Sequence, residues 1–236
     1  YLVSVTVLSD REVQVNFSKN MGDGVLEPLN YTISGSGQGD FLPHPDDVSG
    51  EFDTYVLTWN CPRNMLNGGD ISITVNAAIQ GEDGNTVGSP LTRTDTGGAI
   101  AALPVIEMIG ESPVDVECGG AYADAGATAT DQCYTSLIVS TDNPVNPNAP
   151  GAYVVSYDAM DSGGNVAIQQ TRDVIVSDTA APEITLNGDA SIVVECGSSF
   201  SDPGVTAVDT CDGDLTAAVE AGGDTVNALV TGVYVI

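Results

Sequence analysis

An internal repeat is the feature that most constrains the fold of this chain. Residues 104–137 align without a gap with residues 182–215 at a constant offset of 78, and 14 of the 34 positions are identical. After a three-residue difference in length, the pairing resumes where the segment Gly151 to Tyr153 matches Gly232 to Tyr234. A period of about 80 residues indicates one module copied in tandem. We therefore expect a row of small modules.

Within the first copy, short runs alternate apolar and polar residues, which predicts strands with one buried face. The expected strands are residues 114–117, 137–140, 152–159 and 166–176. No window has a helical period, and about seven strands in roughly 80 residues are typical of an antiparallel sandwich. Tyr153 follows the sequence NAPG at the head of its strand, which fits either a tyrosine corner or an ordinary core tyrosine.

The first hundred residues do not align with the repeat, but they show the same strand pattern. Alternating runs predict strands near residues 3–7, 13–17, 55–59 and 71–75. We expect three modules, at residues 1–103, 104–181 and 182–236, joined by linkers at 97–104 and 177–182. Compared with its twin, the third module stops at Ile236 inside a strand that begins near Val233. Either the natural chain continues, or another chain supplies the missing strand.

The charge of the chain excludes several classes of partner. There are 33 Asp and Glu against 5 Lys and Arg, a formal net charge of −28. A nucleic-acid backbone or an anionic lipid surface needs a basic footprint, which this sequence lacks. No apolar run approaches the roughly 20 residues that cross a bilayer, so we expect no membrane insertion in this segment. Divalent cations, in contrast, would be attracted.

Two stretches resemble known families. "PEITLNGD" and "VVECGSSFSDPGVTAVDTCDGDLT" of the third module, with "PGAYVVSYDAMDSGGNVA" of its twin, resemble bacterial Ig-like domains of the hyalin-repeat type over residues 104–236. Residues 1–98, with "VTVLSDREVQVNFSKNM" and "NYTISG", look like the Ig-like domain of surface-layer proteins. The resemblance implies an all-β fold of tandem Ig-like antiparallel β-sandwiches in an elongated array, on or outside a bacterial cell, with no activity of its own.

The cysteines are spaced alike in the two copies, 15 residues apart in each: Cys118 and Cys133, and Cys196 and Cys211. This spacing predicts one disulfide inside each copy. Closing a loop of about 15 residues would stabilise the fold by roughly 3 kcal/mol, because it reduces the entropy of the unfolded chain. A zinc site or free buried thiols are the alternatives, and a chain with one histidine has few further zinc ligands. Cys61 is left over, either as a buried free thiol or as an intermolecular bridge. Disulfides favour an extracellular or cell-surface location.

Asp-rich turns are candidates for calcium, the only cofactor that the sequence suggests. In "DTCDGDLT" the candidate ligands are Asp209, Asp212 and Asp214, although their spacing does not fit an EF-hand loop. The twin replaces the last two acids with Tyr134 and Ser136, so these acids are dispensable for folding the module. Three further candidates lie in the DSGGN loop and the second linker: Asp161, Asn165 and Asp178. Solvated turns are the alternative for every one of them.

For catalysis the sequence offers little. His44 is the single histidine, in a loop between two prolines, and no nucleophile or phosphate-binding motif stands in the required context. We therefore expect a non-catalytic structural segment of a large exported bacterial protein that forms a stalk, fibre or filament. Its expected partners are other copies of itself or neighbouring Ig-like modules. The alternative is an adhesin or the carbohydrate-binding accessory region of a secreted multidomain enzyme, with cell-surface or glycan ligands. That alternative needs an exposed aromatic platform, whereas we expect the single tryptophan, Trp59, to lie in the core.

Overall fold

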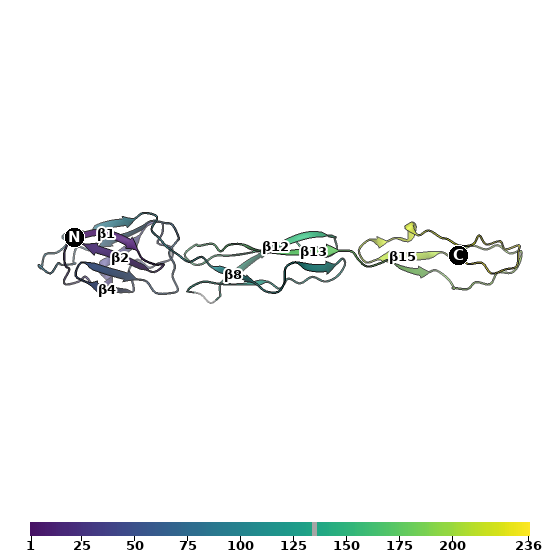
Figure 1. Cartoon of the computed structure of the whole chain (residues 1–236), viewed down its shortest axis with the longest axis horizontal. Helices are drawn as coiled ribbons and strands as arrows, with labels where there is room; N and C mark the ends of the chain where they lie inside the picture. Colours follow the sequence, from purple (N-terminus) through teal and green to yellow (C-terminus); the bar gives the residue numbers. More distant parts are fainter. Residues whose placement is uncertain (134–135) are drawn as a thin grey trace. The chain divides into compact units, whose positions relative to one another are not determined.

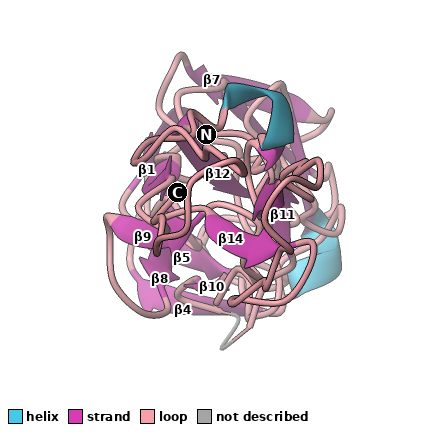
Figure 2. Cartoon of the chain, turned by 90° about the vertical axis from the view of Figure 1, so that its right-hand side faces the viewer, coloured by secondary structure: helices cyan, strands magenta, loops and turns pink. Residues whose placement is uncertain are grey.

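The computed structural model describes residues 1–133 and 136–236. These residues pack into two compact units. The first unit contains residues 1–110, 125–142 and 156–171, and the second contains residues 111–124, 143–155 and 172–236. Figure 2 shows that strands and loops make up nearly all of the chain. The helical segments in the described part are two three-residue 3-10 turns, η1 (Pro28–Asn30) and η2 (Thr216–Ala218), and no helix there is long and apolar enough to span a membrane.

The first module folds as a sandwich of two antiparallel sheets. One sheet has the order β1-β2-β5-β4 and the other β3-β6-β7; β1, β2 and β4 are labelled in the purple to blue part of the ribbon (Figure 1). Within the first sheet, Val13 lies opposite Leu57. The seven strands are β1 (Leu2–Val7), β2 (Glu12–Phe17), β3 (Tyr31–Ser34), β4 (Asp47–Glu51), β5 (Thr54–Thr58), β6 (Ile71–Val75) and β7 (Leu91–Asp95).

The core of this sandwich confirms the alternation seen in the sequence. Every second residue of β2 is buried, and so is every second residue of β6. Side chains from both sheets join one hydrophobic cluster, in which Leu57 and Ile73 are fully buried. Trp59 is also fully buried, stacks on Phe41 with ring centroids 5.2 Å apart, and donates its indole N–H to the carbonyl of Leu42. Trp59 is therefore part of the core and offers no surface platform.

The second module has two sheets, of order β10-β8 and β11-β12-β13-β9. The prediction of strands at 114–117 and 152–159 is confirmed closely, while two expected strands begin later than predicted. Leu137 and Val166 form only isolated bridges, because each pairs with a single residue of a neighbouring segment. The strands are β8 (Val105–Met108), β9 (Val114–Glu117), β10 (Ala127–Thr130), β11 (Val139–Asp142), β12 (Gly151–Ala159) and β13 (Gln170–Ser177).

The third module has one sheet, of order β14-β15-β16. Its strands are β14 (Glu183–Leu186), β15 (Val205–Asp209) and β16 (Gly213–Asp214). The expected strand near Val233 is not formed. The backbone N–H of Asp224 donates to the Val235 carbonyl at 2.6 Å, and this segment joins none of the sheets of the described residues. Several apolar side chains of this module are exposed, and Val193 and Val233 are more than nine-tenths exposed.

Both copies of the repeat contain a tyrosine corner. The Tyr153 hydroxyl donates to the carbonyl of Ala149 at 2.9 Å, four residues upstream. The Tyr234 hydroxyl contacts the carbonyl of Val230, at the same separation, at 3.2 Å. A tyrosine that bonds back to the backbone at a loop corner is a hallmark of Ig-like sandwiches. Of the two interpretations that the sequence left open for Tyr153, the structure supports the corner.

Candidate functional site

The disulfides are the most informative sites in this chain, and they do not pair as the spacing predicted. Cys61 is bonded to Cys133, with Cα atoms 5.2 Å apart, and Cys118 is bonded to Cys211, with Cα atoms 5.5 Å apart. Both separations lie in the usual range for a disulfide. Cys196 is a free, exposed cysteine. The predicted pairs Cys118–Cys133 and Cys196–Cys211 are therefore wrong, and so is the prediction that Cys61 is a free or intermolecular thiol.

The error has a simple physical origin. A spacing of 15 residues that recurs with the repeat fits a bridge inside each copy, but it fits equally a bridge from each copy to the next. Cys118 and Cys133 are each bonded to a cysteine of another module, so neither is available to the other. The bridge Cys118–Cys211 has a sequence separation of 93, which is the 78-residue repeat offset plus the 15-residue spacing. Each disulfide thus joins one module to the following module.

Hydrogen bonds surround the first bridge, where the first module meets those parts of the second module that belong to the same compact unit. The Asn64 side-chain N–H donates to the carboxylate of Asp131 at 2.8 Å. The Asn165 side chain donates to the carbonyl of Met65 at 2.7 Å and accepts from the backbone N–H of Asn67 at 2.8 Å. Asn64 and Asn165 are both buried. We call these residues, with Cys61 and Cys133, the first junction.

The DSGGN loop is shaped to fit this junction. Asp161 accepts from the backbone N–H and the side-chain N–H of Asn165, at 2.8 and 2.7 Å, and so fixes the asparagine that reaches the first module. Gly163 lies so close to that module that a Cβ atom would come within 2.7 Å of the Asn64 carbonyl oxygen. Asp161 and Asn165, two of the calcium candidates, are therefore engaged in protein contacts, and a side chain at 163 would separate the modules.

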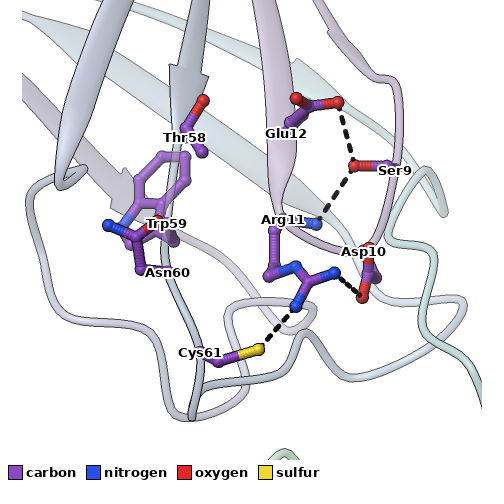
Figure 3. A pocket seen from close by; sticks show the side chains of 8 residues that line it. All are labelled: Ser9, Asp10, Arg11, Glu12, Thr58, Trp59, Asn60 and Cys61. Atoms are coloured by element: carbon purple, nitrogen blue, oxygen red, sulfur yellow. Dashed lines mark hydrogen bonds and ion pairs between the residues drawn. The ribbon is translucent and has the colours of Figure 1, made fainter. Parts of the chain in front are cut away.

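A pocket of about 600 Å³ opens beside this bridge. Figure 3 shows the Arg11 guanidinium pointing at Cys61 and at Asp10. Arg11 lies 3.0 Å from the Cys133 sulfur and 3.4 Å from the Asp10 carboxylate. The other residues that line the pocket are Ser9, Glu12, Thr58, Trp59 and Asn60. The Arg11 charge is already matched by Asp10, and the Glu12 carboxylate accepts a hydrogen bond from the Ser9 hydroxyl at 3.2 Å.

The second bridge is supported by Glu117, which precedes the buried Cys118. The Glu117 carboxylate accepts from the backbone N–H groups of Thr179 and Ala180, at 2.8 and 2.9 Å, and from the Thr179 hydroxyl at 2.6 Å. These hydrogen bonds lower the pKa of the Glu117 carboxyl. They hold the linker that leads into the third module. We call Glu117, Cys118, residues 178–180 and Asp209 to Cys211 the second junction.

Asp209 positions the other half of this bridge. Its carboxylate is nearly buried and accepts from the backbone N–H groups of Cys211 and Asp212, at 2.7 and 3.0 Å. This is an Asx turn, in which a side chain replaces a backbone partner. Gly119 lies directly against the next residue of that turn, since a Cβ atom at 119 would come within 2.3 Å of the Thr210 methyl group. Asp209 therefore serves as a turn former, and Gly119 as the surface that the turn covers.

Of the calcium candidates, Asp178 and Asp212 come together beside this bridge. Their carboxylates and the Cys211 sulfur lie within 4.8 Å of one another. The sulfur belongs to a disulfide and is no thiolate ligand, so two exposed carboxylates remain, whereas calcium takes six to eight oxygens. Partial loss of hydration and repulsion from Asp209 and Asp212 raise the pKa of Asp178. A calcium ion at this place stays a prediction.

The remaining candidates have other roles or lie elsewhere. The Asp214 carboxylate accepts from the backbone N–H of Thr216 at 2.9 Å, at the start of η2. Hydrogen bonding from the Thr216 side chain, and then from its backbone, lowers the pKa of Asp214. His44 lies in a loop, with its Nδ1 2.6 Å from the Tyr31 carbonyl oxygen. Tyr134, which replaces an acid in the twin of the DTCDGDLT turn, falls outside the described residues. The sequence missed Asn64, Met65 and Asn67, because nothing in their local pattern says that a second module will contact them.

The family model described as bacterial surface protein, Ig-like domain, matches residues 106–176 and 184–236, more than half of the chain. The chain belongs to this family. As a bacterial surface Ig-like protein it has an extracellular or cell-surface location, in agreement with its oxidised cysteines. The two matched segments fall within the second and third modules that the repeat defined.

Among solved structures, this surface Ig-like chain is similar to parts of S-layer proteins. The N-terminal part of the bacterial S-layer protein SbsC is 14% identical with a TM-score of 0.32, over 75% of this chain and 44% of that one. The S-layer protein rSbsC(31-844) is 15% identical with a TM-score of 0.33, over 90% of this chain and 30% of that one. This chain thus spans less than half of either structure. No curated protein matches it.

Proposed function

We propose that this chain is a non-catalytic structural segment of an exported bacterial protein, and that its modules form a stalk, fibre or filament whose neighbours are locked together by disulfides. The observation that supports the proposal is the pairing of the cysteines: each bridge ties one module to the next. A chain that only displayed separate binding modules would gain stability from bridges inside each module and would not need bridges between modules. A chain that carries load gains a covalent path between modules.

The two disulfide loops overlap, and the overlap has a mechanical consequence. The loop closed by Cys61 and Cys133 shares residues 118–133 with the loop closed by Cys118 and Cys211. Under tension between the termini, the covalent path runs from Tyr1 to Cys61, crosses to Cys133, returns to Cys118, crosses to Cys211 and ends at Ile236. The remaining residues lie in loops that bear no load, so they cannot be pulled out.

Stretching single molecules by their termini tests the proposal. In the oxidised chain the path is roughly 100 residues, or on the order of 350 Å when extended, against about 800 Å for the reduced chain. A Cys196→Ser background removes the free thiol from the experiment. If the oxidised chain extends as far as the reduced chain, the modules are not locked and the proposal fails.

Removing one bridge at a time gives matched controls. Replacing both Cys61 and Cys133 by serine leaves a path of roughly 145 residues, or about 500 Å. Replacing both Cys118 and Cys211 leaves roughly 165 residues, or about 570 Å. Two intermediate lengths in this order would support overlapping loops, whereas bridges within each copy would protect only short, separate segments.

The adhesive alternative gains no support from the described residues. The single tryptophan, Trp59, is fully buried in the core of the first module, as the sequence predicted. Glycan or cell-surface ligands stay a prediction, and other copies of the chain or neighbouring Ig-like modules are the partners that we propose.

A further inference from the structure

Cys196 occupies the position in the third module that Cys118 occupies in the second, at the repeat offset of 78. Cys118 is bonded to the following module through Cys211, whereas Cys196 is free and exposed. The pattern of bridges is directional. In each case the cysteine nearer the C-terminus, Cys133 or Cys211, bonds to a cysteine of the preceding module.

The turn that follows Cys196 has the geometry of the turn that follows the bonded Cys118, although no strand equivalent to β9 precedes it. After Cys118, the N–H of Gly119 donates to the carbonyl of Pro147 at 2.8 Å. After Cys196, the N–H of Gly197 donates to the carbonyl of Ala228 at 2.8 Å, and Ala228 matches Pro147 in the repeat. Both glycines have positive φ, at 75° and 89°. The turn that presents Cys118 to its partner is therefore preformed at Cys196 without a partner.

The surface beside the two turns differs in what covers it. At Gly119 a Cβ atom would collide with Thr210 of the following module, whereas at Gly197 no described atom lies within 4 Å of a Cβ atom. The side chain of Cys196 is occupied only by a weak contact with the carbonyl of Leu229 at 3.6 Å. The third module thus has the same turn after its cysteine, but no described residue covers Gly197 as Thr210 covers Gly119.

We propose that Cys196 forms a disulfide with a cysteine at the Cys133 or Cys211 position of a further module of this kind, and so continues the linkage. This inference rests on the proposed structural function and extends it. Both known partners follow an aspartate by two residues, Asp131 before Cys133 and Asp209 before Cys211, and Asp209 shapes the turn that presents its cysteine. The partner of Cys196 is therefore a cysteine in an Asp-x-Cys turn.

The chemistry requires an external disulfide as oxidant, either glutathione disulfide or a disulfide-bearing protein. The Cys196 thiolate attacks that disulfide, forms a mixed disulfide and releases one thiol. The partner thiolate then attacks the Cys196 sulfur and releases the second thiol. The net reaction oxidises two protein thiols to one S–S bond and reduces one external disulfide to two thiols.

Peptide mapping of the native protein, taken from the cell surface and alkylated before any reduction, tests the proposal. We expect the peptide that contains Cys196 to be linked to a peptide with an Asp-x-Cys sequence, and to react with the alkylating agent only after reduction. The mass of the unreduced species separates the two sources of the partner. An unchanged monomer mass means a module of the same polypeptide, and a larger mass means another chain.

A free Cys196, a Cys196–Cys196 bridge or a partner without the Asp-x-Cys turn would each overturn the inference. A matched variant, Cys196→Ser with Val193→Cys, moves the thiol to an exposed position off the turn, since Val193 is 96% exposed. Its cross-link yield should fall at least about tenfold, because the thiol loses the effective concentration that docking provides. An equal yield would also overturn the inference. The stretching experiment contains no Cys196, so the two proposals fail independently.

Discussion

The two compact units of this chain are stabilised in different ways. The first unit contains a full sandwich, in which two sheets bury a continuous cluster that includes Leu57, Trp59 and Ile73. Among the described residues of the second unit, only a few apolar side chains are buried: Val116, Cys118, Val155, Val174, Val176 and Ala207. A unit with so little apolar burial has a small hydrophobic contribution to its stability. This difference implies that the disulfide and the ion pair contribute a larger share of the stability of the second unit than such links contribute to the first.

Arg172 shows the same difference at one residue. It is the only Lys or Arg of residues 104–181, and its side chain is 1% exposed. It forms an ion pair with Asp124 and donates from Nε to the carbonyl of Glu111 at 3.1 Å. A buried charge is tolerated only when it is paired and hydrogen-bonded. The second unit therefore uses an ion pair where the first unit uses apolar side chains.

The largest expected effect is the loss of the bridge in the second unit. Replacing Cys118 and Cys211 by serine removes the constraint on a loop of about 90 residues, which lowers the free energy of unfolding by about 4 to 5 kcal/mol. We expect the second unit to unfold first while the sandwich stays folded. Fluorescence of the single Trp59 reports the sandwich, and circular dichroism reports both units. If both signals fall together, the two units do not differ as described.

Breaking the buried ion pair should be nearly as costly. Asp124→Ala leaves the Arg172 guanidinium buried without its carboxylate, which lowers the free energy of unfolding of the second unit by about 3 to 5 kcal/mol. Denaturant unfolding followed by circular dichroism measures this change. The double variant Asp124→Leu with Arg172→Met removes both charges and should recover most of the loss. A double variant as unstable as the single one would contradict the argument.

A cavity in the sandwich is the matching test for the first unit. Leu57→Ala removes a fully buried side chain and should cost about 2 to 5 kcal/mol, through lost apolar burial and the cavity that remains. The Trp59 transition should move to lower denaturant concentration, while the second transition stays in place. A shift of the second transition alone would mean that the sandwich core does not stabilise the first unit.

The tyrosine corners should contribute less. Tyr153→Phe removes a hydrogen bond to the Ala149 carbonyl and keeps the ring, so we expect a loss of about 0.5 to 1.5 kcal/mol. Tyr234→Phe removes the equivalent bond in the third module and serves as the matched control. Thermal melts of both variants compare the two copies directly. If neither variant loses stability, the hydroxyl hydrogen bond does not contribute to stability and the tyrosine acts only through the packing of its ring.

The smallest expected effect concerns pH and calcium at the second junction. The pKa of Asp178 is higher in the folded chain than its ordinary value, so folding disfavours its charge at neutral pH, and this cost is relieved as pH falls through the raised pKa. Asp178→Asn should therefore raise Tm at neutral pH, by less than about 2 °C, and have no effect in acid. The pKa of Glu117 is lowered, so its contribution has the opposite sign and is lost as pH falls through that lowered value.

Melts with calcium and with a chelator complete this test. If Asp178 and Asp212 bind calcium, the ion raises the Tm of the unaltered chain, because only the folded state brings the two carboxylates together. The Asp178→Asn variant would then lose that rise. An equal Tm with and without calcium in both proteins would remove the calcium prediction and leave repulsion as the only electrostatic effect.

Most of the fold could be predicted from the sequence, because strand alternation is local. The pattern of Tyr157 and Ala159 in β12 and of Val13 and Val15 in β2 is enough to predict buried faces. The end of the third module could not be predicted in this way. A strand near Val233 forms only if a neighbouring strand pairs with it. The backbone of Val235 bonds instead to Asp224, which belongs to no strand.

The sequence by itself determined the repeat, the all-β class, the tyrosine corner at Tyr153 as one of two interpretations, and an oxidising location. Only the tertiary structure decided which cysteines are paired. The duplicated cysteine pattern is compatible both with bridges within a copy and with bridges between successive copies, whereas a disulfide forms only where two Cα atoms lie about 5 to 6 Å apart. That proximity arises from contacts between modules, such as Gly163 at Asn64 and Gly119 at Thr210, which no local pattern records.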